Sequence, residues 1–132
     1  MKLQDYLKEH RIITDGAMGT YYTQLKGNDR LVSEYANLEE PKLIENIHKQ
    51  YIKAGARLLR TNTFAANTNV LKIGKEEQEK LIRAACKIAK CAAGDAFAGN
   101  ESQKDPVFIA GDIGPIPFSP DHTKQEVVDE YK

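Results

Sequence analysis

The stretch ARLLRTNTFAAN, residues 56–67, changes from an apolar run to a polar segment near Asn62. Short apolar runs that end in polar or glycine-bearing residues are typical of buried strands in parallel sheets. Two further stretches have the same pattern, RIITDGAMGT over residues 11–20 and VFIAGDIGP over residues 107–115. We therefore predict three strands, each of which ends in a polar or glycine-bearing segment.

Helical patterns separate the predicted strands. Pro41 suits the first turn of a helix, and Gly55 suits the left-handed position just past a helix end. Thr123 and Glu126 have the spacing of a capping box, which marks the start of a final helix. The predicted elements are helices over residues 3–10, 41–54, 75–93 and beyond 123, an irregular segment over residues 21–40 with a turn at 27–29, and a surface turn at 102–106.

The alternation of helices and strands predicts an α/β fold with a parallel sheet and right-handed crossovers. All three polar strand ends then open at the same C-terminal edge of the sheet, where α/β proteins place their functional sites. The loops that meet there are DGAMGT, TNTFAAN and GDIGP.

Composition narrows the class of protein. The chain has 132 residues, which fits a single domain over residues 1–132, and its 19 basic and 19 acidic residues give no net charge. Nothing in this balance favours nucleic acid or an anionic membrane surface as a partner. No apolar run approaches the roughly 20 residues of a membrane helix. The polar N-terminus is unlike a secretory signal, so we expect a cytoplasmic protein.

The loop around Asp15 has the chemistry of a site for a free amino acid. Gly16 and Gly19 would let backbone N–H groups approach a carboxylate, and Asp15 could accept hydrogen bonds from an ammonium group. The alternative is that Asp15 caps a turn and the glycines only relieve strain. The residues alone do not decide between the two.

Two other residues have open roles. Arg60 shares a strand face with Asn62 because side chains alternate with a period of two. On an inward face Arg60 would need a carboxylate partner, whereas on the helix face its stem could carry the charge to solvent. His48 lies on the apolar side of its helix, and we predict that it is a packing residue rather than a catalytic base.

Three motifs together resemble one family. They are TDGAMGT at residues 14–20, the run NLEEPKLIENIHKQYIKAGARLLRTNTFAAN at 37–67, and AGDIGP at 110–115. The chain from about Leu3 to Tyr131 resembles the N-terminal part of the homocysteine S-methyltransferase domain, as found in cobalamin-dependent methionine synthases and in bacterial fusions with methylenetetrahydrofolate reductase. The resemblance implies a (β/α)8 TIM barrel that moves a methyl group onto the sulfur of homocysteine to give methionine.

The resemblance also implies roles for individual residues. Asp15 would bind the ammonium group of homocysteine. Three residues would contact its carboxylate through their backbone: Gly16, Ala17 and Met18. Asn62 and Phe64 would line the mouth of the pocket, with Phe64 as an apolar wall, and Asp112 would lie at the rim of the third loop.

The chain differs from the family at the residues that bind zinc. A zinc ion holds the homocysteine thiolate in the family, bound by three cysteines from later parts of the barrel. Cys86 and Cys91 match none of these positions, and on a helix they would point about 140° apart. We therefore predict a fragment that has the amino-acid-binding loops but no zinc ligands, and that is itself inactive. The methyl donor is not determined, and cobalamin or folate would act through other domains.

Three βα units of an incomplete barrel would place their strands in the order one, two, three. The first and third strands would then be open edges, which tend to recruit further strands. We expect such a chain to associate with itself or with a missing C-terminal half. The alternative function is a non-catalytic half-barrel that serves in binding or assembly.

Overall fold

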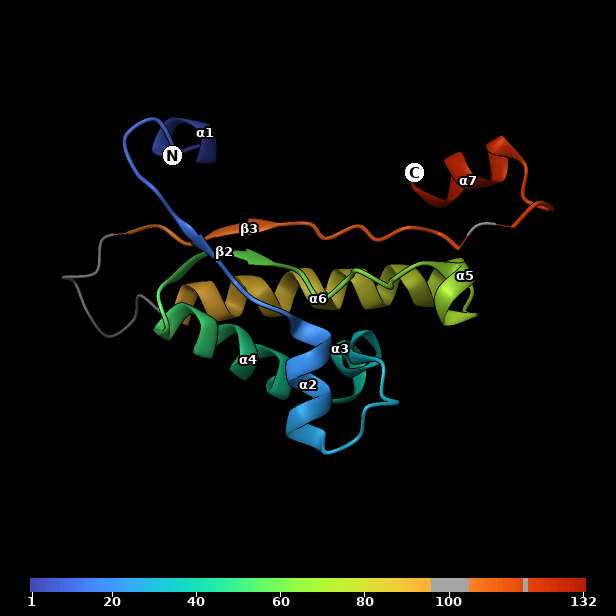
Figure 1. The fold of residues 1–132 in the computed structure, drawn as a ribbon, viewed down its shortest axis with the longest axis horizontal. Coiled ribbons are helices and arrows are strands. Elements are labelled where there is room, and N and C mark those ends of the chain that lie inside the picture. The colour runs from blue at the N-terminus through green and yellow to red at the C-terminus, as the bar shows by residue number, and fades with distance from the viewer. Residues whose placement is uncertain (96–104, 118) are drawn as a thin grey trace.

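The structure, a computed structural model, describes residues 1–95, 105–117 and 119–132. The fold is α/β, with one parallel sheet of three strands in the order β1-β2-β3 (Figure 1). The strands are β1 (Ile13–Thr14), β2 (Ala56–Arg60) and β3 (Phe108–Ala110). This confirms the predicted parallel sheet with the second strand at its centre.

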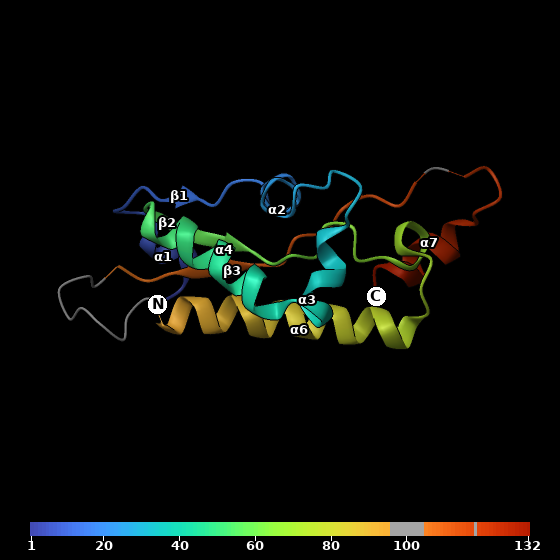
Figure 2. The ribbon, with the colours of Figure 1, turned by 90° about the horizontal axis from the view of Figure 1, so that it is seen from below.

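Helices connect the strands and cover the sheet. They are α1 (Leu3–Tyr6), α2 (Met18–Lys26), the 3-10 helix η1 (Ser33–Tyr35), α3 (Ala36–Glu39), α4 (Pro41–Lys53), α5 (Thr68–Leu71), α6 (Lys75–Asp95) and α7 (Lys124–Glu130). Helices α4 and α6 run along the same face of the sheet, as the two views in Figures 1 and 2 agree. Within the described residues, no helix combines the length and the apolar character needed to cross a membrane.

The core forms where α4 and α6 pack against each other, against α2 and α3, and against β2. Ile44 and Ile47 of α4, Leu59 of β2 and Leu81 of α6 are completely buried. Full burial of a Leu or Ile side chain contributes about 1.5–3 kcal/mol, so this layer supplies much of the stability of the fold. Helix α4 ends where predicted, because Gly55 adopts the left-handed region with φ +109°.

The prediction of an irregular segment over residues 21–40 is wrong. Residues 18–26 form α2, and η1 and α3 occupy residues 33–39. Tyr22 belongs to the buried cluster around Ile44, Met18 and Tyr21 pack against this cluster, and these tertiary contacts stabilise α2. Gly27, with φ +66°, ends α2 at the predicted turn. The surface turn predicted at 102–106 lies mostly outside the described residues.

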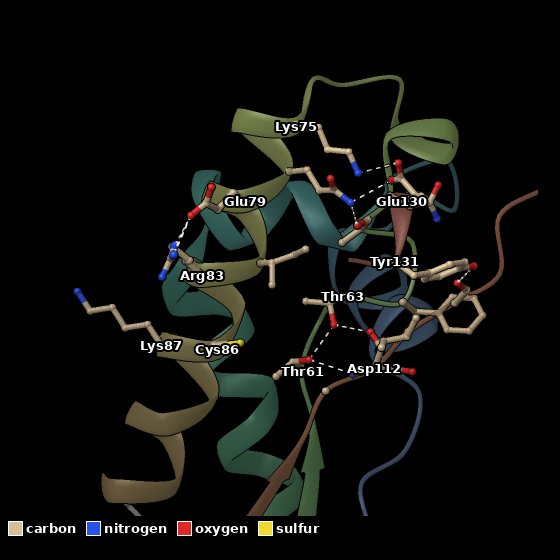
Figure 3. A pocket seen from close by; sticks show the side chains of 18 of the residues that line it. Thr61, Thr63, Lys75, Glu79, Arg83, Cys86, Lys87, Asp112, Glu130 and Tyr131 are labelled. Carbon is tan, nitrogen blue, oxygen red and sulfur yellow. Dashed lines mark hydrogen bonds and ion pairs between the residues drawn. The ribbon is translucent and has the colours of Figure 1, made fainter. Parts of the chain in front are cut away.

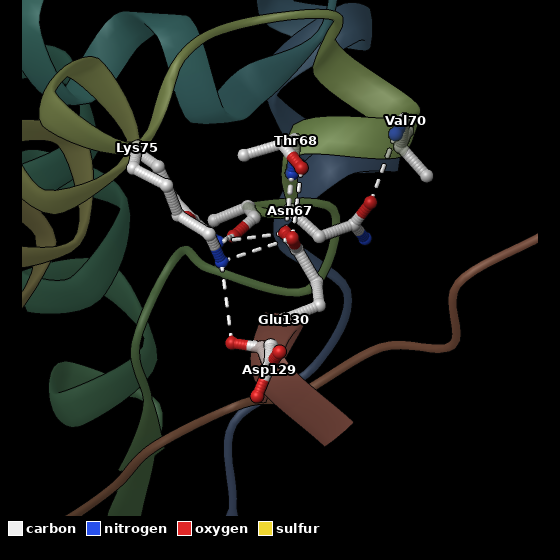
Figure 4. Close-up of polar contacts among 8 residues, drawn as sticks. Asn67, Thr68, Val70, Lys75, Asp129 and Glu130 are labelled. Carbon is white, nitrogen blue, oxygen red and sulfur yellow. Dashed lines mark hydrogen bonds and ion pairs between the residues drawn. The ribbon is translucent and has the colours of Figure 1, made fainter. Parts of the chain in front are cut away.

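Helix α7 is held to the rest of the chain by the carboxylate of Glu130 (Figure 4). Thr68 donates to it from its backbone N–H at 2.6 Å and from its hydroxyl at 2.8 Å. Lys75 Nζ and Gln78 Nε2 of α6 each donate at 3.0 Å. The predicted capping box of Thr123 and Glu126 starts the helix. One side chain therefore joins the segment after β3 to both α5 and α6.

Two strands form the edges of the described sheet. Strands β1 and β3 each pair with β2, so their outer backbone groups have no strand partner among the described residues. The edges carry large exposed apolar side chains, with Ile13 67% exposed and Ile109 37% exposed. Unpaired edges with apolar side chains are surfaces on which further strands can add.

We expect the purified chain to self-associate through these edges. Light scattering after size exclusion should give a molar mass above the 14.8 kDa of one chain, and this mass should increase with protein concentration. The variants Ile13→Lys and Ile109→Lys should shift the protein towards the monomer, because a charge on an edge strand opposes the addition of another strand. The matched control is Leu25→Lys, which places the same charge on an exposed residue of α2. A wild-type monomer at every concentration would contradict this expectation.

Candidate functional site

A cavity of about 520 Å³ lies at the C-terminal ends of the strands. Its wall comes from the segment after β1, the first turn of α2, η1, and the loops after β2 and β3. The seven residues singled out from the sequence all line it: Asp15, Gly16, Ala17, Met18, Asn62, Phe64 and Asp112. The structure therefore brings together loops that are separated by nearly 100 residues in the chain.

Asp15 is buried and bound by Arg60. Its Oδ2 accepts from the backbone N–H of Arg60 and its Oδ1 from Arg60 Nε, both at 2.9 Å. Arg60 Nη2 also donates to the carbonyls of Asp15 and Gly16, at 3.2 and 3.1 Å. The hydrogen bond to Asp15 raises the pKa of the Arg60 guanidinium. Arg60 thus has a carboxylate partner, and about two of the four lone-pair positions of Asp15 have no partner among the described residues.

Gly16 is required by the close approach of Tyr51. A Cβ at Gly16 would lie 2.8 Å from the Tyr51 hydroxyl oxygen, and this hydroxyl donates to the carbonyl of Ala17 at 2.8 Å. The φ of Gly16 is not in the left-handed region, so its backbone alone does not demand glycine. Gly19 differs, because its nearest neighbour would be Ser33 Oγ at 3.8 Å.

The first turn of α2 supplies free backbone donors. Ala17 is the N-cap residue and no described side chain caps the helix, so the first N–H groups have no partner from within the helix. Met18, Gly19 and Thr20 of this turn line the cavity. A helix N-terminus favours an anion through these N–H groups and the helix dipole. The sequence pattern predicted a loop here, whereas the structure has a helix end.

Asn62 fixes the wall of the cavity. Its Nδ2 donates to the carbonyl of Ser33 and to Asn37 Oδ1, both at 2.8 Å. Its Oδ1 accepts from Ser33 Oγ at 2.8 Å, and its carbonyl accepts from Asn37 Nδ2 at 2.8 Å. These bonds use most of the hydrogen-bonding capacity of the Asn62 side chain. Asn62 therefore holds η1 and α3 against the end of β2.

The loops after β2 and β3 are joined by a short polar chain, part of which is visible in Figure 3. Thr61 and Thr63 share a hydrogen bond of 2.7 Å between their hydroxyls, and Thr63 Oγ1 donates to the carbonyl of Asp112 at 2.7 Å. Gly114 donates its N–H to the carbonyl of Phe64 at 3.0 Å. This link places Asp112 at the cavity rim beside Phe64, whose side chain is exposed at the mouth.

Glu34 is a cavity-lining residue that no sequence motif indicated. Glu34 of η1 is only 6% exposed, and its Oε1 accepts from the backbone N–H of Ala65 at 2.9 Å. It belongs to the segment that was predicted to be irregular. No local pattern marks it, because the partner that positions it lies 31 residues further along the chain.

A second, larger cavity of about 1100 Å³ lies between α6 and the segment from β3 to α7 (Figure 3). Its α6 wall includes Arg83, Cys86 and Lys87, and Tyr131 faces them. Asp15 and the first turn of α2 do not line it. The smaller cavity is the candidate site, because the buried carboxylates and the free helix N–H groups converge there.

Comparison with known proteins now gives the family. The sequence model described as Homocysteine S-methyltransferase matches residues 12–132. The chain belongs to the homocysteine S-methyltransferase family. As a member of it, the chain is 36% identical over 78 residues to methionine synthase of Mycobacterium tuberculosis and 35% identical over 78 residues to that of Mycobacterium leprae. Each match covers 52% of this chain and 6% of the relative.

Solved structures agree with this membership of the homocysteine S-methyltransferases. The homocysteine methyltransferase MmuM from Escherichia coli matches with a TM-score of 0.72 in its metallated form and 0.73 in its oxidized form, at 27% identity. The matches cover 86% of this chain, but only 41% and 40% of the two MmuM chains. The chain therefore spans less than half the length of these relatives.

The described residues do not fit the zinc ion that the homocysteine S-methyltransferase resemblance implies. Cys86 and Cys91 are free, both lie on α6, and both line the larger cavity rather than the candidate site. In the described ranges, no three side chains of His, Cys, Asp or Glu are placed to hold a metal ion. His48 is fully buried on α4, as expected for packing, and burial lowers its pKa.

Replacement of Gly16 and of Gly19 by alanine should have different effects on stability. Gly16→Ala forces Tyr51 to move and should cost about 1–3 kcal/mol of unfolding free energy. Gly19→Ala, in the first turn of α2, would bring its Cβ only into ordinary contact with Ser33 Oγ and should be neutral or stabilise by up to about 1 kcal/mol. Urea unfolding followed by circular dichroism measures both. Equal stability of the two variants would show that Tyr51 does not restrict Gly16.

Proposed function

We propose that this chain supplies the amino-acid-binding loops of a methyltransferase domain that moves a methyl group to the sulfur of homocysteine and forms methionine. Family membership supports the reaction class. The observation that carries the proposal is the convergence of Asp15, the first turn of α2 and Phe64 on one cavity at the C-terminal edge of the sheet. In this arrangement an acidic, an N–H-rich and an apolar surface face the same space.

Each of these surfaces suits one part of the substrate. Asp15 accepts a charge-assisted hydrogen bond from the ammonium group through the lone pairs that Arg60 leaves free. The substrate carboxylate lies against the free N–H groups that follow Gly16, at Ala17 and Met18. Phe64 provides an apolar wall for the methylene groups. Asn62 and Asp112 shape the cavity mouth.

We propose further that the three strands are the first three βα units of a TIM barrel that is incomplete in this chain. The coverage of 41% of the MmuM chain supports this proposal. A domain of this family would then take its zinc ligands from segments that have no counterpart here. A methyl donor such as methylcobalamin or a folate would be presented by other domains. Activation of the homocysteine thiol is accordingly assigned to no residue of this chain.

Replacement of Asp15 by asparagine should weaken the binding of L-homocysteine to the chain. Loss of a hydrogen bond to a charged group costs roughly 1.5–3 kcal/mol, which corresponds to about a ten- to hundredfold higher dissociation constant. An NMR titration of the 132-residue chain measures it. Asp29→Asn, which removes the charge of an exposed residue at the same cavity, is the matched control. If Asp15→Asn bound L-homocysteine as tightly as the wild-type chain, Asp15 would have only a structural role.

The chain by itself should form no methionine. A free thiol has a pKa near 8.5, so homocysteine is mostly protonated at neutral pH and is a weak nucleophile without further activation. Purified chain incubated with homocysteine, zinc and methylcobalamin, or with a methylated amino acid, should give only the background rate. Methionine formation at an enzymatic rate, retained after gel filtration, would contradict the proposal that the activating groups lie elsewhere.

A further inference from the structure

The candidate cavity holds a second buried carboxylate whose charge is not balanced. Glu34 is 94% buried, and its Oε1 accepts one neutral hydrogen bond, from Ala65. Its Oε2 is 3.4 Å from Ser33 Oγ, but that hydroxyl has a shorter partner, Asn62 Oδ1, at 2.8 Å. None of the ion pairs formed within the described ranges includes Glu34.

Asp15 shows the contrast. Its carboxylate is neutralised by the Arg60 guanidinium at 2.9 Å, whereas Glu34 faces the same cavity without a cation. A buried carboxylate is costly unless it is paired. The charged residues that line the cavity are four carboxylates and one guanidinium: Asp15, Asp29, Glu34, Asp112 and Arg60. Acidic side chains therefore outnumber basic ones in the cavity, and the buried, unpaired Glu34 is the carboxylate that a cationic group of a ligand would stabilise most.

Glu34 is also held in place by its neighbours. The preceding residue, Ser33, is bound to the Asn62 side chain through both its hydroxyl and its carbonyl, each at 2.8 Å. Ala65 fixes Glu34 Oε1 from the loop after β2. Both contacts come from the wall of the cavity, so the free Oε2 is positioned before any ligand binds. Such preorganisation reduces the entropy lost on binding.

We propose that Glu34 is a substrate-binding residue that accepts a hydrogen bond from the ammonium group of the amino acid, together with Asp15. An ammonium group has three N–H donors, so two carboxylates can share it. The inference rests on the proposed function, because it assumes that the cavity binds an α-amino acid. It assigns to Glu34 the discrimination between an α-amino acid and the same thiol acid without its amino group.

The test compares two ligands and two variants. L-Homocysteine and 4-mercaptobutyrate differ only in the amino group, and NMR titration of the 132-residue chain gives both dissociation constants. Glu34→Gln keeps an oxygen for the Ala65 N–H but loses the charge. It should raise the dissociation constant of homocysteine roughly tenfold or more and leave that of 4-mercaptobutyrate within about twofold. Glu39→Gln, at an exposed glutamate of α3, should change neither.

The outcomes separate this inference from the proposed function. Wild-type affinity of Glu34→Gln for homocysteine would overturn the inference alone. An equal loss of affinity for both ligands would also overturn it, since Glu34 would then only support the wall of the cavity. If the wild-type chain bound 4-mercaptobutyrate as tightly as homocysteine, or bound neither, no ammonium group would be recognised and the proposed function would fall as well.

Discussion

The site depends on the contact between Asp15 and Arg60. The carboxylate follows β1, and it is bound by the backbone and the side chain of the last residue of β2. The same guanidinium holds the carbonyl of Gly16, so the chain leaves β1 along one defined path. That path leads directly into α2, where the free N–H groups face the cavity. One ion pair at the sheet edge thus sets the direction of the first helix and the position of its anion-binding end.

The polar network around Asn62 has a similar effect on the other wall. It joins the end of β2 to η1 and α3 with four hydrogen bonds of 2.8 Å. A buried network in which every member is bonded favours one arrangement over its alternatives. A residue can therefore belong to a site by holding its neighbours, and Asn62 does so for Ser33 and Glu34. Its place in the sequence motif is consistent with this role as well as with contact to a ligand.

The sequence predicted those parts of the fold that have a local signal. The three apolar runs became strands, Gly55 ended α4, and Thr123 capped α7. Helix α2 was missed although Met18, Tyr21, Tyr22 and Leu25 have helical spacing, because the glycines and polar residues around them favoured a loop. Glu34 was missed because the partner that positions it is distant in sequence. Local pattern thus located the loops of the site, whereas long-range contacts decided which groups in them are free.

The contacts that hold α7 make the stability of this part of the fold depend on pH. Burial alone would raise the pKa of Glu130, but the hydrogen bonds from Thr68 and the charge of Lys75 outweigh it, so the pKa lies below its ordinary value. A group with a depressed pKa stabilises the folded state above its unfolded pKa, near 4.5, and this contribution is lost as the pH falls through the folded value. We therefore expect protonation of Glu130 to weaken the contacts that hold α7 to α5 and α6, since its charged hydrogen bonds to Thr68, Lys75 and Gln78 depend on the carboxylate.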